Sequence, residues 1–182
     1  MKRCLIPIII AAAVTLGACA QPAAGATASQ FDQALALAQQ GNVSAQYNLG
    51  VMYTQGQGVA QDYAAAVSWY RKAADQGNAE AQNNLGAMYV NGQGVAKDLA
   101  AAISWYRKAA DQGNASAQYN LGVMYGNGQS VAQDYVQAHK WFSLGAASGD
   151  ADSVKGRDIV AREMTPAQIA EAQRLASTWR AK

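Results

Sequence analysis

A 36-residue internal repeat constrains the fold of this chain more than any other feature of its sequence. Residues 45–80, 81–116 and 117–152 form three consecutive blocks, and about 28 of the 36 positions are identical between the first two. The third block keeps the same framework of leucine, tyrosine and tryptophan, and residues 31–44 match the second half of a block. Units this short bury their apolar faces only by stacking, so the repeat predicts an array of units that share a core.

Each block has the apolar spacing of two helices. In the first block the two stripes, both at helical period, consist of Ala45, Leu49, Met52 and Tyr53, and of Ala66, Trp69, Tyr70, Ala73 and Ala74. The sequence therefore predicts an all-α fold of antiparallel helix pairs.

Polar residues and glycines interrupt the apolar stripes at the same interval. Asp62 stands where a helix N-cap is expected, and Gly77 and Asn78 end one helix and cap the next. The later equivalents are Asp98, Asp134, Gly113, Asn114, Gly149 and Asp150. In contrast, Gly50, Gly86 and Gly122 fall in mid-helix, where glycine costs about 1 kcal/mol relative to alanine. Their recurrence predicts that a neighbouring helix presses on each of them.

The spacing is similar to that of known repeat families. Leu49-Gly50-x-x-Tyr53 followed by Ala66, Tyr70 and Ala73 resembles the tetratricopeptide pattern. The Gly-x-Gly-Val loop at 56–59 and the Trp-Tyr-x-Lys-Ala-Ala-x-x-Gly segment at 69–77 resemble the Sel-1-like repeat, over roughly residues 31–150. This resemblance implies a right-handed α-solenoid that binds protein partners. The third block departs from it at Ser130, which replaces the second loop glycine.

The segments outside the blocks have different compositions. Residues 1–20 combine Lys2 and Arg3 with an apolar stretch and small residues, which predicts a signal peptide and export. Residues 21–30 are rich in Ala, Gly, Ser and Thr, as expected of a flexible tether. Residues 153–182 break the period, and Thr165-Pro166-Ala167-Gln168 reads as a capping box, so this segment is expected to form capping helices.

The end of the predicted signal peptide allows two forms of processing. Leu16-Gly17-Ala18-Cys19 resembles the bacterial lipobox, which implies acylation of Cys19 and anchoring in a membrane. Ala18-Cys19-Ala20 also fits ordinary cleavage after Ala20. The expected location is the periplasm or the outer membrane, or the exterior if the chain is secreted. The only membrane attachment expected is the lipid on Cys19.

Charge and residue types exclude several function classes. Without Lys2 and Arg3, 12 basic and 12 acidic side chains remain, so no basic field indicates nucleic-acid binding. No cysteine follows Cys19 and His139 is the single histidine, so neither a metal site nor a cofactor is expected. His139 is interpreted as an ordinary surface residue of a helix. Most carboxylates recur with the repeat, as structural residues do, so the chain is not expected to be an enzyme.

The predicted function is a non-catalytic scaffold of the bacterial cell envelope that binds a protein or peptide on the concave face of the array. The candidate binding residues are Tyr47, Asn48, Asn83, Asn84, Tyr119 and Asn120, because they vary among the repeats or carry amides. The recurring asparagines, and the glutamines at 46, 82 and 118, either line this groove or hydrogen-bond between repeats. Arg71 and Lys72 are expected to pair with Asp75 on a solvated face.

Two alternative functions follow from the resemblance. Some exported Sel-1-like proteins are linked to penicillin binding or hydrolysis, but they carry a cysteine pair in each repeat. This chain has no such pair and no Ser-x-x-Lys motif. The other alternative is a structural envelope component associated with peptidoglycan.

Overall fold

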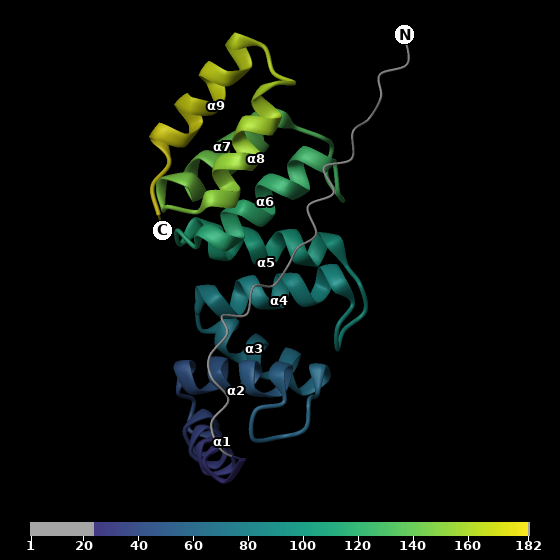
Figure 1. Ribbon diagram of the computed structural model, residues 1–182, viewed down its shortest axis with the longest axis vertical. Coiled ribbons are helices and arrows are strands. Elements are labelled where there is room, and N and C mark those ends of the chain that lie inside the picture. Colours follow the sequence, from purple (N-terminus) through teal and green to yellow (C-terminus); the bar gives the residue numbers. More distant parts are fainter. Residues whose placement is uncertain (1–23, 182) are drawn as a thin grey trace. The chain divides into compact units, whose positions relative to one another are not determined.

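The computed structural model describes residues 24–181, which contain nine helices and no strand (Figure 1). The helices are α1 Ala24–Gln39, α2 Val43–Gln55, α3 Tyr63–Asp75, α4 Ala79–Asn91, α5 Leu99–Asp111, α6 Ala115–Asn127, α7 Tyr135–Ala147, α8 Ala151–Ala161 and α9 Pro166–Thr178. Consecutive helices pack as pairs, so the all-α solenoid class predicted from the repeat is confirmed. The helices belong to two compact units, an N-terminal unit up to residue 109 and a C-terminal unit from residue 110.

The predicted helix boundaries are confirmed by their caps. The side chains of Asn42, Asn78 and Asn114 each accept a hydrogen bond from the backbone N–H three residues later, at 2.7–2.9 Å. Asp62 accepts from two backbone N–H groups at the start of α3. These bonds satisfy N–H groups that have no partner within the helix, so every block begins its helices at the same positions.

The connection between the two helices of a block keeps one geometry in all three blocks. Gly58 and Gly94 have φ values of 71° and 67°, in the left-handed region. Ser130, which replaces this glycine in the third block, has φ 58° and is the one non-glycine residue with positive φ among those described. The loop therefore retains its shape, and the serine side chain carries the conformational cost.

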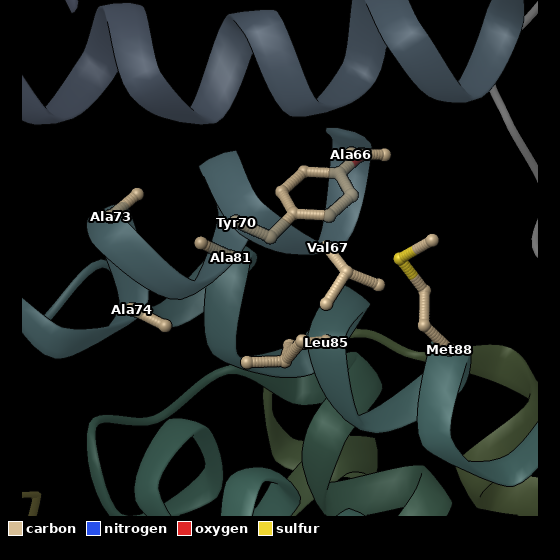
Figure 2. Close-up of a cluster of buried hydrophobic side chains, with 8 residues drawn as sticks. All are labelled: Ala66, Val67, Tyr70, Ala73, Ala74, Ala81, Leu85 and Met88. Carbon is tan, nitrogen blue, oxygen red and sulfur yellow. The ribbon is translucent and has the colours of Figure 1, made fainter. Parts of the chain in front are cut away.

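The core of the N-terminal unit lies between α3 and α4, where eight buried side chains meet (Figure 2). Alanines predominate, so the helices approach closely, and Tyr70 supplies the largest buried side chain of this cluster. Gly50 on α2 faces its ring, and Gly86 faces the ring of Tyr106 in the same way. A Cβ atom on Gly86 would lie 2.7 Å from Tyr106 Cδ1, so the prediction that a neighbouring helix presses on these glycines is confirmed.

Buried glutamines tie each repeat to the preceding helix. Gln46, Gln82 and Gln118 donate from Nε2 to the carbonyl oxygens of Ala38, Ala74 and Ala110, at 3.0–3.2 Å. Each carbonyl lies in the last turn of the preceding helix, where backbone acceptors lack intrahelical partners. Of the two interpretations of the glutamines, hydrogen bonding between repeats is therefore the correct one.

The C-terminal unit is closed by α8 and α9. Phe142 of α7 packs with Val160, Met164 and Ala172, which come from α8, the following turn and α9. Thr165 and Gln168 form the predicted capping box at the start of α9, with Pro166 in its first turn. This segment therefore covers α7 with apolar side chains.

Two expectations are corrected by the structure. First, α1 begins at Ala24, so residues 24–30 are helical and are not part of a flexible tether. Alanine and glutamine favour the helical conformation. The later part of α1 packs on α2, and the helix continues from this packed part toward the N-terminus. Second, His139 is buried, with 4% of its surface exposed, because it takes the repeat position held by Val67 and Ile103.

The predictions for residues 1–20, including the signal peptide and Cys19, lie outside the described residues. Among the helices that the structure describes, none is both long enough and apolar enough to cross a membrane.

Candidate partner-binding surface

Charged residues are distributed unequally between the two helices of each repeat. The first helices α2, α4 and α6 contain a single charged side chain, Glu80. The second helices α3 and α5 each contain an arginine, a lysine and an aspartate. Among the exposed or half-buried positions of the first helices, four repeat positions share one face of the helix: 44, 47, 48 and 51, with 80, 83, 84 and 87, and 116, 119, 120 and 123. We call these positions the first-helix face of the unit in which they lie, that is, α2 and α4 in the N-terminal unit and α6 in the C-terminal unit.

The first helices are also where nearly identical repeats diverge. The first two blocks differ at eight positions, and five of these pairs (47/83, 51/87, 54/90, 55/91 and 80/116) lie on first helices. The buried positions of the same helices are identical, as at Leu49 and Leu85. The packing framework is therefore kept while the exposed chemistry changes from one repeat to the next.

Tyr47 is half-buried on α2, against the second helix of its own repeat. Its ring centroid lies 5.9 Å from that of Tyr70, and the two planes are tilted by 42°. Burial raises the pKa of Tyr47, the Glu80 carboxylate raises it further, and a hydrogen bond from Asn84 lowers it. The side chain is thus a neutral phenol held in place from one side, with its remaining surface open to solvent.

Asn84 joins neighbouring repeats within the N-terminal unit. Its side chain hydrogen-bonds the hydroxyls of both Tyr47 and Tyr70. Asn83 donates weakly to Asn84 Oδ1, at 3.5 Å, and Thr54 donates to the Tyr70 hydroxyl at 3.4 Å. The structure therefore brings three of the candidate residues together, and gives Asn84 an internal bonding role.

The other candidate residues have different surroundings. Asn48 is exposed on α2. Tyr119 on α6 is half-buried, with its ring centroid 5.7 Å from that of Phe142. Burial, followed by the carboxylates of Asp152 and Asp150, raises the pKa of Tyr119 to about 12. Asn120 is half-buried and adjoins Tyr119 on the same helix.

The carboxylates that act on the two tyrosines were not predicted from the sequence. Glu80 and Asp152 influence Tyr47 and Tyr119, respectively. Both occupy the repeat position of Ser44 and Ser116, where an acid replaces serine. This exchange was visible in the aligned repeats, but it did not indicate that the acids lie near the tyrosines.

The cations of the second helices do not form the expected pairs with Asp75. Lys72 Nζ lies 3.9 Å from the centroid of the Trp69 ring, and Lys108 is placed in the same way over Trp105. Arg71 donates to the Tyr89 hydroxyl and lies over that ring. An ammonium is attracted to the negative face of an aromatic ring, so these lysines cover the half-buried tryptophans.

The described residues also bear on catalytic and metal-binding chemistry. Within residues 24–181, no three His, Cys, Asp or Glu side chains are grouped so that they could hold a metal ion. The buried His139 interacts with Ser143 Oγ, 3.3 Å from Nδ1, and its pKa is lowered by burial and by Arg157. The most developed polar arrangement is the set of tyrosines and amides on the first-helix face, which suits binding of another chain.

Comparison with known proteins places these observations in a family. A family model described as Sel1 repeat matches residues 43–78, 79–114 and 115–150, which is the same 36-residue period in a frame shifted by two residues. No curated protein shows a significant sequence match.

Two solved structures share both fold and sequence with this chain. One is a Sel1 repeat protein from Oxalobacter formigenes, with 31% identity, a TM-score of 0.71, and coverage of 82% of this chain and 62% of that one. The other is a protective antigen of uropathogenic Escherichia coli with an SLR fold, with 32% identity, a TM-score of 0.52, and coverage of 82% and 40%. This chain spans less than two thirds of the length of either relative. With three matched repeats covering more than half of its length, the chain belongs to the Sel1 repeat family.

Proposed function

We propose that this chain is a non-catalytic scaffold of the bacterial cell envelope that binds a partner protein at the first-helix face of its units. Sel1 repeats generally mediate protein–protein interaction, which supports the general part of this proposal. The observation that carries the specific part is the segregation of charge: three first helices share the single charge of Glu80, and the candidate asparagines and tyrosines lie on these helices.

An uncharged polar face favours a particular mode of recognition. Asparagine both donates and accepts hydrogen bonds, so it can satisfy the N–H and C=O groups of a bound main chain. Tyrosine adds a large contact area with few rotatable bonds. Because binding of this kind depends little on long-range charge, we expect the affinity to change little with ionic strength.

The test is site-specific photo-crosslinking in cells that express the full chain. A photoreactive amino acid is placed at Asn48 or Ser116 on the first-helix face, and at Ser68 or Ser104 on the second helices as matched exposed controls. We expect one protein adduct from positions 48 and 116 that is absent from 68 and 104, and the adduct from position 116 should be lost when Asn48→Arg is added. Adducts that form only from the second helices would refute the proposal.

The envelope location is proposed from the signal sequence and Cys19. Labelling cells with a palmitate analogue should mark the wild-type chain and leave Cys19→Ser unlabelled. An unlabelled wild-type chain in the soluble exported fraction would instead support cleavage after Ala20.

A further inference from the structure

A pair of glutamine side chains joins the two helices of the first repeat. Gln46 of α2 is buried, and its Oε1 accepts a hydrogen bond from Nε2 of Gln76, the C-cap residue of α3, at 2.7 Å. We call this bond the glutamine clasp. Nε2 of Gln46 donates in turn to the carbonyl oxygen of Ala38 in α1. One buried amide thus ties three consecutive helices together, and both of its polar atoms are satisfied.

The third repeat keeps only part of this arrangement. Gln118 of α6 donates to the carbonyl oxygen of Ala110 in the preceding helix, at 3.2 Å. The repeat position of Gln76 is occupied by Ser148, whose side chain ends two atoms earlier and cannot span the same gap. Gln118 Oε1 is therefore buried without a hydrogen-bond partner, on a residue that is 1% exposed.

Two further polar atoms without partners surround the same helix. Among the residues whose side chains the structure describes, the buried side-chain nitrogen and oxygen atoms that lack a hydrogen bond are Gln118 Oε1, Trp141 Nε1 and Ser153 Oγ. They lie on α6, α7 and α8, that is, on α7 or on a helix packed against it. Ser153 stands where the earlier repeats have alanine, and its hydroxyl lies against Gly145 of α7. Each of these atoms loses its bonds to water on folding and gains none in return, which destabilises the packed form of α7.

We propose that the C-terminal end of α7 opens locally from α6 and α8 more readily than the equivalent end of α3 opens from its neighbours. The end of α7 lacks the clasp that fixes α3 to α2, and the unpartnered atoms regain bonds to water when it opens. Because Phe142 of α7 packs against Tyr119, with ring centroids 5.7 Å apart, the opening loosens a residue of the first-helix face of the C-terminal unit. The opening itself is independent of the proposed function, whereas its effect on the binding surface rests on that function.

The two helix ends have the same backbone geometry, so the clasp can be exchanged between them. Gln76 has φ −89° and ψ 7°, and Ser148 has φ −87° and ψ 5°. A glutamine at position 148 would therefore leave α7 in the direction in which Gln76 leaves α3, toward Gln118. Ser148→Gln restores the missing clasp, and Gln76→Ser removes the one that is present.

The experiment is amide hydrogen exchange of the full chain, followed by mass spectrometry of peptides from α3 and α7. We expect lower protection factors in residues 140–147 than in the equivalent residues 68–75. Ser148→Gln should raise the protection of residues 140–147 about fivefold, the effect of one added hydrogen bond, and leave residues 68–75 unchanged. Gln76→Ser should lower the protection of residues 68–75 by at least this factor, because it leaves Gln46 Oε1 buried without a partner.

A matched control separates the clasp from general effects of substitution. Ser104→Gln makes the same change at an exposed serine of α5 and should alter the protection of neither segment. Equal protection of the two segments in the wild type, or no gain in residues 140–147 with Ser148→Gln, would overturn the proposal. If Ser148→Gln protects α7 but leaves the yield of the crosslinked adduct from position 116 unchanged, only the link to the binding surface is overturned. A lack of adducts from both positions 48 and 116 would instead overturn the proposed function.

Discussion

The ring of Phe142 is held between two glycines from different helices, and this arrangement allows a quantitative prediction. A Cβ atom on Gly122 of α6 would lie 2.6 Å from both Phe142 Cδ1 and Cε1, and one on Gly156 of α8 would lie 2.6 Å from Cε1. An ordinary contact begins near 3.4 Å, so Gly122→Ala requires a displacement of 3.4 − 2.6 = 0.8 Å. The ring cannot yield toward α8, because Gly156 already closes that side.

Two opposing effects decide the stability of Gly122→Ala. Replacing a mid-helix glycine by alanine contributes about 1 kcal/mol through helix propensity. Overpacking a buried site costs about 1–3 kcal/mol, and the upper half of this range applies because the ring is confined on both sides. We therefore expect Gly122→Ala to lower the free energy of unfolding by about 1–2 kcal/mol.

Urea unfolding followed by circular dichroism measures this change, and the Phe142→Ala background provides the control. Removing the ring removes the clash, so in that background Gly122→Ala should raise the free energy of unfolding by up to about 1 kcal/mol. The reversal of sign is the diagnostic result. If Gly122→Ala stabilises the chain that retains Phe142, the ring does not occupy the space above this glycine.

Three further substitutions test other parts of the structure. Ser130→Gly should raise the free energy of unfolding by about 1 kcal/mol by relieving the left-handed backbone, and Gly58→Ser at the equivalent position should lower it similarly in the same urea assay. The folded-state pKa of His139 lies below its ordinary 6.5, so the contribution of the neutral ring to stability should be complete above pH 6.5 and should fall as the pH drops below 6.5, a dependence that His139→Val removes from thermal melts. Asn84→Ala should cost about 1 kcal/mol, whereas Asn48→Ala should leave the melting temperature unchanged while weakening partner binding, which paired melting and affinity measurements would show.

The helices and their ends could be predicted from the sequence because their determinants are local and repeated. Asp62, Asn78 and the glycine after each helix cap backbone groups only a few residues away. The 36-residue period places these capping residues at equivalent positions, so they could be recognised without knowledge of tertiary contacts. The start of α1 was missed because residues 24–30 have no counterpart in the repeat. The burial of His139 was missed although Val67 occupies the equivalent position, which is the signal that could have revealed it.

Contacts between side chains were harder to predict than helix boundaries. Lys72 has Trp69 three residues before it and Asp75 three residues after it, so helical spacing permits either partner. The structure places the ammonium over the tryptophan ring. Among the candidate binding residues, the composition of the repeat did not reveal which amides were already bonded within the protein.

A single repeat position shows how scaffolding and recognition are divided. Asn84 bonds the hydroxyl of Tyr70, the tyrosine of the preceding second helix. In the C-terminal unit that tyrosine is replaced by Phe142 of α7, which has no hydroxyl, and the asparagine is replaced by Gly156 of α8, which gives the ring room. In the half repeat before Asn48, the position equivalent to Tyr70 is occupied by Ala34, which also has no hydroxyl. Asn48 is nevertheless retained, and its side chain is exposed. An internal partner therefore does not account for Asn48, and its amide is the one on the first-helix face best placed to bind another chain.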